Sequence, residues 1–524
     1  MSSVCDPLLA GSASGRMSRS HLHCRSNASR ISAMVAERLS VVGAASEKRQ
    51  GSAAGAAVNT LCNVIGAGVL SLPLALYEAS IVGGLVLMVY TALMAGFGAF
   101  FVVIGCETSQ RFSFTEVMSF TLFPSRTFEE FCSSRGTPVN EAHSSSGGTS
   151  RMDALRDQHK EDEIVRRKRR RLITVLLELA VFLNNYGALI IYSRVISDSI
   201  PPVIHTLFNT DGLFVTRAFW LVTSGIIFFV LSCVRHMDEL KWTSLLGFLT
   251  IFYIVVIVVL RFFTSRQSVP YPDIKPEQYG DINWTHLGTG IFRTMSTYGV
   301  AFGYHYNIPY FYRELKCRTP VNMMKSVYIS FPIIFVCYAA TGFFGYLTFG
   351  NLVADPKCGG DIVRNFYDDD FLANIGRLGL FLHFACVYPI LSVCARRGLH
   401  RLVMHALMWK KLTLRFEGRE EEEDDDDEML LGGPSVSISV VLAATISGIS
   451  VVIDVIGALF GAFLMLTGPG LLGWYAFSST QLLGVLACRH ARLFTCITLL
   501  LIATGVVFTV AGAWYVIGQY LFHH

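Results

Sequence analysis

The chain has 524 residues, of which 52% are hydrophobic and only 16% are charged, whereas an average soluble domain has about 25% charged residues. A soluble chain of this length would fold into several domains that each need a charged surface, so the composition excludes an ordinary soluble protein. The mean hydropathy of +0.47 and the small net charge of +4 instead indicate a polytopic membrane protein in a lipid bilayer, with no nucleic-acid partner.

Polar residues dominate the first fifty positions, so residues 1–52 are predicted to form a disordered cytoplasmic tail and residues 53–520 a transmembrane domain. A bilayer core about 30 Å thick is crossed by roughly 20 helical residues. Eleven stretches of this all-α chain satisfy that length: 53–77, 81–105, 172–200, 217–234, 242–263, 287–312, 323–349, 372–395, 436–452, 454–480 and 493–520. The ninth and tenth of these stretches are separated only near Ser450–Asp454, and together they can also be interpreted as a helical hairpin or a re-entrant element.

Lys and Arg residues gather on one side of the predicted membrane. With the N-terminus in the cytoplasm, cytoplasmic segments such as the loops 106–171 and 396–435 hold 34 of them, and the three longer outer loops hold 4. Positive residues mark the cytoplasmic side, so the C-terminus is predicted to be extracytoplasmic after an odd number of spans. The sequon that begins at Asn283 falls in an outer loop, where glycosylation is expected in a eukaryote.

Two cytoplasmic segments look disordered. Residues 133–163 mix Ser, Gly and charge, and they lead into the basic block 166–171, which is interpreted as an anchor beside anionic lipid. The acidic run 420–428 is either a solvated linker or part of an acidic dileucine signal for sorting adaptors, with Asp426, Leu430 and Leu431. The choice between the plasma membrane and an acidic organelle such as a lysosome or vacuole therefore stays open.

The first span contains the sequence Gly66-Ala67-Gly68, followed by Pro73. Gly and Pro interrupt helices, and an interrupted backbone inside a membrane is tolerated only where it lines a cavity or site. The N–H groups of a second half-helix carry the positive end of its dipole, which suits a substrate carboxylate. The alternative is close helix packing through small residues.

The sixth span is interrupted in the same way, by Phe302-Gly303 and Pro309, with His305 and Asn307 near membrane depth. Spans one and six are corresponding members of two five-span halves. Paired interruptions at matching positions indicate an inverted-repeat transporter with its site at the bilayer midplane.

These residues resemble the amino acid/auxin permease family. The resemblance rests on Asn63–Pro73, on His305 nine residues before Glu314-Leu315, and on Phe344–Gly350. It implies a LeuT-type fold of the APC superfamily, with two inverted five-helix repeats and one further helix, and transport by alternating access. It also implies that the substrate α-carboxylate binds the backbone of Gly66, Ala67 and Gly68, and the α-amino group the carbonyls around Phe302 and Gly303.

The coupling ion is where the sequence departs from that family. Sodium-coupled members usually carry Asn where this chain has Cys62 and a hydroxyl where it has Val387. A hard cation prefers oxygen ligands, so sodium is disfavoured unless backbone carbonyls bind it. Protonatable residues inside the predicted spans are candidates for proton coupling: Glu178, His305, His383 and Asp454. Each has a structural alternative, such as pairing with the basic block, packing or, for Asp454 at the outer turn, helix capping.

Two further polar features lie in the spans. The cluster Asn184-Asn185-Tyr186 of span three either forms interhelical hydrogen bonds or, as the resemblance implies for an aromatic residue of this span, contacts the substrate through Tyr186. Arg293 is either a gate residue or a side chain that snorkels to the headgroups.

The sequence therefore predicts a secondary active transporter of small or neutral amino acids, by proton symport or exchange. The alternatives are an amino-acid sensor with the same fold and a sodium-coupled symporter. An enzyme is disfavoured because no nucleotide loop or nucleophile elbow is found. No cofactor or metal is expected, since the 13 cysteines show no CxxC spacing.

Overall fold

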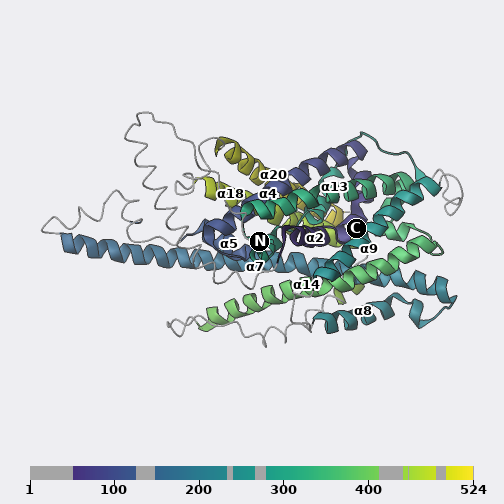
Figure 1. The fold of residues 1–524 in the computed structure, drawn as a ribbon, viewed down its shortest axis with the longest axis horizontal. Helices are drawn as coiled ribbons and strands as arrows, with labels where there is room; N and C mark the ends of the chain where they lie inside the picture. Colours follow the sequence, from purple (N-terminus) through teal and green to yellow (C-terminus); the bar gives the residue numbers. More distant parts are fainter. Residues whose placement is uncertain are drawn as a thin grey trace, which may run out of the picture.

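The computed structural model describes residues 51–124, 131, 148–232, 240–265, 279–411, 441–445, 448–478 and 491–522. These residues are helical apart from turns, loops and one isolated bridge between Gly51 and Leu315. The helices lie side by side in an elongated bundle, and one long helix, α7, extends well beyond it (Figure 1). Almost all of the predicted tail 1–52 and the predicted sorting residues Asp426, Leu430 and Leu431 lie outside the described residues.

Seven helices of the described part are long and apolar enough to cross a membrane, or eight when the bent pair α2 (Ala53–Val64) and α3 (Leu72–Ala79) is one broken span. The fold class is confirmed: an all-helical, multi-pass protein with interrupted first and sixth spans. The count of eleven stays a prediction, because the ninth predicted span is described only in part. The helices are α4 (Ile81–Ser109), α7 (Gly148–Phe208), α9 (Leu240–Ser265), α13 (Pro320–Phe349), α14 (Phe371–Lys411), α17 (Ile449–Ile456) continuing to α18 (Gly468–Ser478), and α20 (Ala491–Phe522), with the shorter α8 (Arg217–Ser232).

The predicted boundary near Ser450–Asp454 is wrong. α17 begins after Gly448, which has an extended backbone, and it continues through two π-helical stretches into α18, so that residues 449–476 form one apolar span. Asp454 therefore lies inside a helix and does not cap one at a turn. A charged residue normally marks the edge of a span, but the charge of this carboxylate is balanced by Arg293 within the protein.

The predicted disorder of residues 133–163 is wrong for the described part, because α7 begins at Gly148. Ion pairs one helical turn apart support this polar extension: Arg166 lies 2.9 Å from Asp162, and Arg167 lies 3.7 Å from Glu163. In the basic block, Arg170 donates to the backbone carbonyl of Phe123 at 2.7 Å. This block is therefore a helical surface that also contacts protein.

Glycines bring the sixth span against the tenth. A Cβ on Gly299 of α11 (Ile291–Ala301) would lie 3.2 Å from the backbone nitrogen of Ala462, and a Cβ on Gly461 would lie 2.9 Å from the carbonyl carbon of Gly299. Small residues allow such close backbone approach in membranes, where packing replaces the hydrophobic effect between helices. The broken sixth span is thereby held in the middle of the bundle.

Candidate functional site

The first span breaks where the sequence predicts. α2 ends at Val64, and a 3₁₀ turn over Ala67–Ser71 leads into α3, with a bend of 46° between the two parts. Gly66, Ala67 and Gly68 are all buried. A Cβ on Gly68 would lie 3.1 Å from the Cα of Ala301 in α11, so Gly68 also serves close packing, which was the alternative interpretation.

The sixth span breaks opposite the first. α11 ends at Ala301, Phe302 has a non-helical backbone, and a short 3₁₀ turn, η4 (His305–Asn307), leads into α12 (Ile308–Glu314). The amide of Phe302 donates to the carbonyl of Tyr298 at 3.0 Å, and the amide of Gly303 donates to that of Val300 at 3.2 Å. The ends of two half-helices thus meet, with carbonyl groups of α2 and α11 beside the N–H groups that begin the second half of span one.

Tyr338 of α13 joins the two breaks. Its hydroxyl oxygen lies 2.6 Å from the carbonyl of Val64 and 2.7 Å from that of Ala301, and the side chain is fully buried. One hydroxyl proton serves one carbonyl at a time, so these two chain ends share a single donor. This residue was not predicted, since a lone tyrosine in an apolar span carries no signal that it caps two broken helices.

A tyrosine of span three that was not predicted, Tyr192, contacts the first break. The hydroxyl of Tyr192 would lie 3.1 Å from a Cβ on Gly66, and its ring stacks on Phe384 of α14 at 4.3 Å. Tyr186 instead stacks on Phe182, one turn earlier in α7, at 5.4 Å. The predicted substrate contact of Tyr186 is therefore not among the contacts that the structure gives, and it stays untested.

Arg293 lies on one side of the two breaks, where it pairs with two carboxylates. Its guanidinium lies 2.9 Å from the carboxylate of Glu78 at the end of α3 and 2.9 Å from that of Asp454 in α17. The side chain of Arg293 is 18% exposed and that of Asp454 only 2%. Arg293 thus ties three spans together and does not snorkel, which supports its interpretation as a gate residue.

On the other side of the breaks, the residue before α2 pairs with the end of α12. The amide of Gly51, just before α2, donates to the carbonyl of Glu314 at 3.2 Å, and the amide of Lys316 donates to the carbonyl of Gly51 at 2.9 Å. A Cβ on Gly51 would lie 2.7 Å from that Glu314 oxygen. With the ion pairs of Arg293 at the opposite ends of these spans, contacts between spans one and six lie on both sides of the paired breaks.

Two candidate histidines are fully buried and each has one unpaired nitrogen within the described residues. His305 Nε2 lies 2.8 Å from the carbonyl of Ala95, and His383 Nδ1 lies 2.9 Å from that of Gly247. A carbonyl accepts only, so these nitrogens carry the proton. His305 Nδ1 and His383 Nε2 have no hydrogen-bond partner, which leaves a lone pair on each that can take up a proton.

The structure also describes Cys62 and Val387, the two residues that weigh against sodium coupling. Cys62 and Val387 are both buried. A Cβ on Gly247 would lie 3.3 Å from Cys62 Sγ and 3.1 Å from His383 Nδ1, so a thiol and an imidazole occupy this contact between spans one, five and eight. Neither supplies the oxygen ligand that a hard cation prefers.

Glu178 lies near the end of span three that the sequence predicts to be cytoplasmic. Its Oε1 lies 3.5 Å from Arg401 Nη1 in the part of α14 that continues past the predicted span. This ion pair reaches a different helix from the basic block with which the sequence allowed Glu178 to pair. The other carboxylate oxygen, Oε2, is buried without a hydrogen-bond partner among the described residues.

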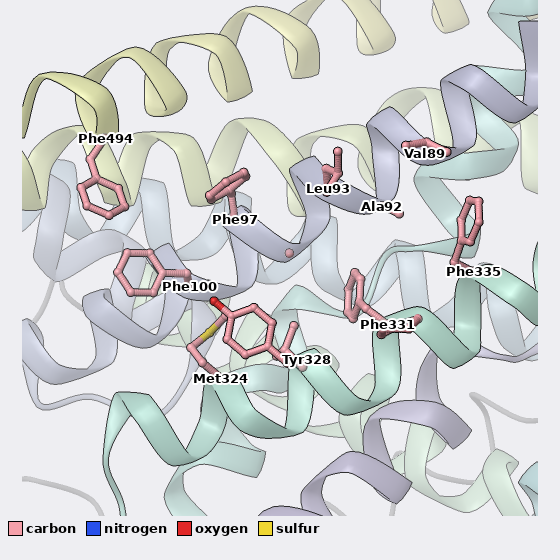
Figure 2. A pocket seen from close by; sticks show the side chains of 13 residues that line it. Val89, Ala92, Leu93, Phe97, Phe100, Met324, Tyr328, Phe331, Phe335 and Phe494 are labelled. Atoms are coloured by element: carbon pink, nitrogen blue, oxygen red, sulfur yellow. The ribbon is translucent and has the colours of Figure 1, made fainter. Parts of the chain in front are cut away.

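A groove between α4 and α13 does not suit an amino acid. Figure 2 shows apolar and aromatic side chains of both helices, such as Phe97 and Phe331, around it, with Phe494 of α20 at one end. Its volume is about 520 Å³. Leu93 and Tyr328 on its rim are well exposed, so it opens on the outside of the bundle. A zwitterion needs polar partners, which this lining does not supply.

The predicted glycosylation residue Asn283 lies in the loop before α11. Its Oδ1 accepts from the amide of His286 and its Nδ2 donates to the carbonyl of His286, both at 2.9 Å. The neighbouring Trp284 and Thr285 are exposed. The sequon is therefore at the surface, although its modification stays a prediction.

Replacement of Asn283 by Gln is expected to remove one N-linked glycan, because Gln is not an acceptor in the sequon. The measurement is the shift in gel mobility upon glycosidase treatment of the protein made in eukaryotic cells. Wild-type protein should shift and the variant should not; an identical shift of both would contradict the outer placement of this loop.

Two broken spans that meet inside the bundle and pack through glycines are typical of multi-pass membrane transporters. The chain belongs to the transmembrane amino acid transporter family, whose family model, "Transmembrane amino acid transporter protein", matches residues 49–512. The predicted membership of the amino acid/auxin permease family is thereby confirmed, and the proteins of this family are transporters and not enzymes.

Individual relatives agree with this family. The chain is 24% identical to the amino acid transporter AVT6E of Arabidopsis thaliana, over 67% of this chain and 63% of that protein. It is 27% identical to sodium-coupled neutral amino acid transporter 7 of Danio rerio, over 49% and 52%, and 22% identical to vacuolar amino acid transporter 6 of Saccharomyces cerevisiae, over 44% and 50%. The chain thus spans about half to two thirds of the length of these relatives.

Among solved structures, the model is similar to a mutant of the manganese transporter of Eremococcus coleocola. The two share 11% sequence identity, with a TM-score of 0.46 and coverage of 89% of this chain and 88% of that one.

Proposed function

We propose that this protein moves amino acids across a membrane by alternating access, with the substrate held between the breaks of spans one and six. The observation that carries this proposal is the buried meeting of the two breaks around Tyr338, closed by Arg293 on one side and by Gly51 on the other. A site enclosed on both sides is what alternating access requires between its two open states.

The broken helices suit the two ends of a zwitterion. The N–H groups at the start of residues 67–79 present positive partial charge to an α-carboxylate, and the carbonyls at the end of α11, near Phe302 and Gly303, present negative partial charge to an α-ammonium group. Tyr192, Tyr338 and Ala301, which contact residues of the two breaks, are all uncharged. This supports neutral amino acids as substrates.

Proton coupling is the favoured driving force. His305 follows the second break directly and keeps one unpaired nitrogen in a fully buried position, while Cys62 and Val387 offer no oxygen to sodium. Protonation of His305 would place a charge beside the break and would change the balance between occluded and open states.

The test is uptake of a radiolabelled panel of neutral amino acids into proteoliposomes, with proton and sodium gradients imposed separately. We expect saturable uptake that responds to the proton gradient alone. Uptake driven only by sodium would contradict the coupling, and binding without flux under either gradient would contradict transport in favour of a sensor.

Replacement of His305 by Gln is expected to flatten the pH dependence of uptake more than it lowers the maximal rate. Gln can still donate to the carbonyl of Ala95 but cannot take up a proton. Initial rates between pH 5 and pH 8 would be compared with those of the wild type. His383→Gln is the comparison variant, since His383 is also fully buried against a carbonyl but belongs to α14 and not to the sixth span. If the pH profile of His305→Gln equals that of the wild type, His305 serves packing and not proton coupling.

A further inference from the structure

One face of α7 connects the inner side of the protein with the first break. Residues 178, 181, 185, 189 and 192 are spaced three or four apart and therefore share one side of the helix. At one end of this face Glu178 and Val181 line a cavity with Tyr306 and Asn307, which are residues of η4. At the other end the Tyr192 hydroxyl lies against Gly66.

Asn185 lies midway along this face, about 10 Å from either end at 1.5 Å per residue. The side chain is fully buried, and neither its Oδ1 nor its Nδ2 has a hydrogen-bond partner within the described residues. Unpaired buried amides are costly and rare in proteins. The side-chain amide of Asn185 can therefore donate a hydrogen bond to, and accept one from, a bound polar ligand.

The cavity at the inner end has groups of both charges. Glu178 is 3% exposed with Oε2 unpaired, and Arg401 Nη1 is 3.5 Å from its Oε1. The space has a volume of about 40 Å³, which is enough for water but not for an amino acid. A carboxylate and a guanidinium at one site complement the ammonium and carboxylate of a zwitterion.

We propose that Glu178, Asn185 and Arg401 form a second, cytoplasm-side site for a zwitterionic amino acid. The substrate occupies it after the contact between Gly51 and Leu315 opens and the cavity widens. Glu178 accepts a hydrogen bond from the α-ammonium group, and Arg401 donates to the α-carboxylate. The side-chain amide of Asn185, between this cavity and the first break, hydrogen-bonds to the ammonium or the carboxylate group as the substrate passes. This inference rests on the proposed function, because it concerns the same transported substrate.

The first test compares Asn185→Leu with Asn184→Leu, whose side chain leaves the helix about 100° away. Fluxes are measured in right-side-out and inside-out vesicles, with the neutral amino acid that the wild type transports fastest in a panel that includes alanine and glutamine. Asn185→Leu should keep the KM for outer substrate and lower the rate of transport from the cytoplasmic side about tenfold. Its thermal midpoint should rise, because an unpaired amide is replaced by an apolar group.

A second variant, Glu178→Gln, preserves shape and removes the charge. In equilibrium exchange at one fixed pH, the KM on the cytoplasmic side should rise about tenfold, with the outer KM unchanged. Unaltered cytoplasmic kinetics of both variants would overturn the second site while leaving the proposed function intact. Absence of flux in the wild type would overturn both.

Discussion

Replacing Gly68 by Leu is expected to abolish amino-acid uptake while the protein still reaches the membrane and its glycan is still attached. Even a Cβ at this position lies 3.1 Å from the Cα and 3.3 Å from the Cβ of Ala301, so a larger side chain must push the two breaks apart. Overpacking of this kind costs about 1–3 kcal/mol, which a folded protein can survive, but the spacing of the zwitterion's two partners would be lost. Uptake and surface expression are measured together.

Gly96 provides the matched control. A Cβ there meets nothing within 4 Å, and the residue lines the apolar groove between α4 and α13. Gly96→Leu adds the same volume to an unbroken membrane-spanning helix, and uptake should be retained. Normal uptake by Gly68→Leu would show that the paired breaks do not hold the substrate.

Replacing Arg293 by Met is expected to destabilise the protein strongly and to stop transport. The substitution leaves the carboxylates of Glu78 and Asp454 without their shared cation, and Asp454 is nearly inaccessible. Breaking a buried ion pair by removing one partner costs about 3–5 kcal/mol. The measurement is the thermal midpoint of the purified protein together with uptake in proteoliposomes.

A triple variant separates loss of stability from loss of function. Adding Glu78→Gln and Asp454→Asn to Arg293→Met removes all three charges and should restore most of the thermal midpoint. In the proposed mechanism the attraction between these groups closes one side of the site, so the occluded state should stay weakened and transport slow. A thermal midpoint of Arg293→Met equal to that of the wild type would show that the ion pairs do not hold spans one, six and ten together.

The two helix breaks were predictable because Gly and Pro report directly on backbone conformation. Their partners were not. Arg293 lies 215 residues from Glu78 and 161 residues from Asp454 in the chain, so their pairing depends on how the spans pack and no local pattern contains it. The same holds for Tyr338, whose two carbonyl partners belong to spans one and six.

Other parts of the prediction failed for a local reason. Asp454 was predicted at a span boundary because an isolated charge is costly in lipid. Its partner Arg293 is too far away in the sequence for the pairing to be recognised there. Residues 148–163 were judged by composition alone, although charges spaced one helical turn apart stabilise a helix in water. In both cases the residue types were informative only together with their partners.

The length of α7 has a mechanical consequence. Its 61 residues extend about 90 Å at 1.5 Å per residue, some three times the thickness of the bilayer core, and Figure 1 shows its N-terminal part clear of the bundle. Along this helix, Ala154 lies 34 residues, or about 50 Å, from Ala188. Tilting span three by about 10° would carry Ala154 sideways by roughly 9 Å. A small tilt of span three would thus produce a much larger displacement at the N-terminal end of α7.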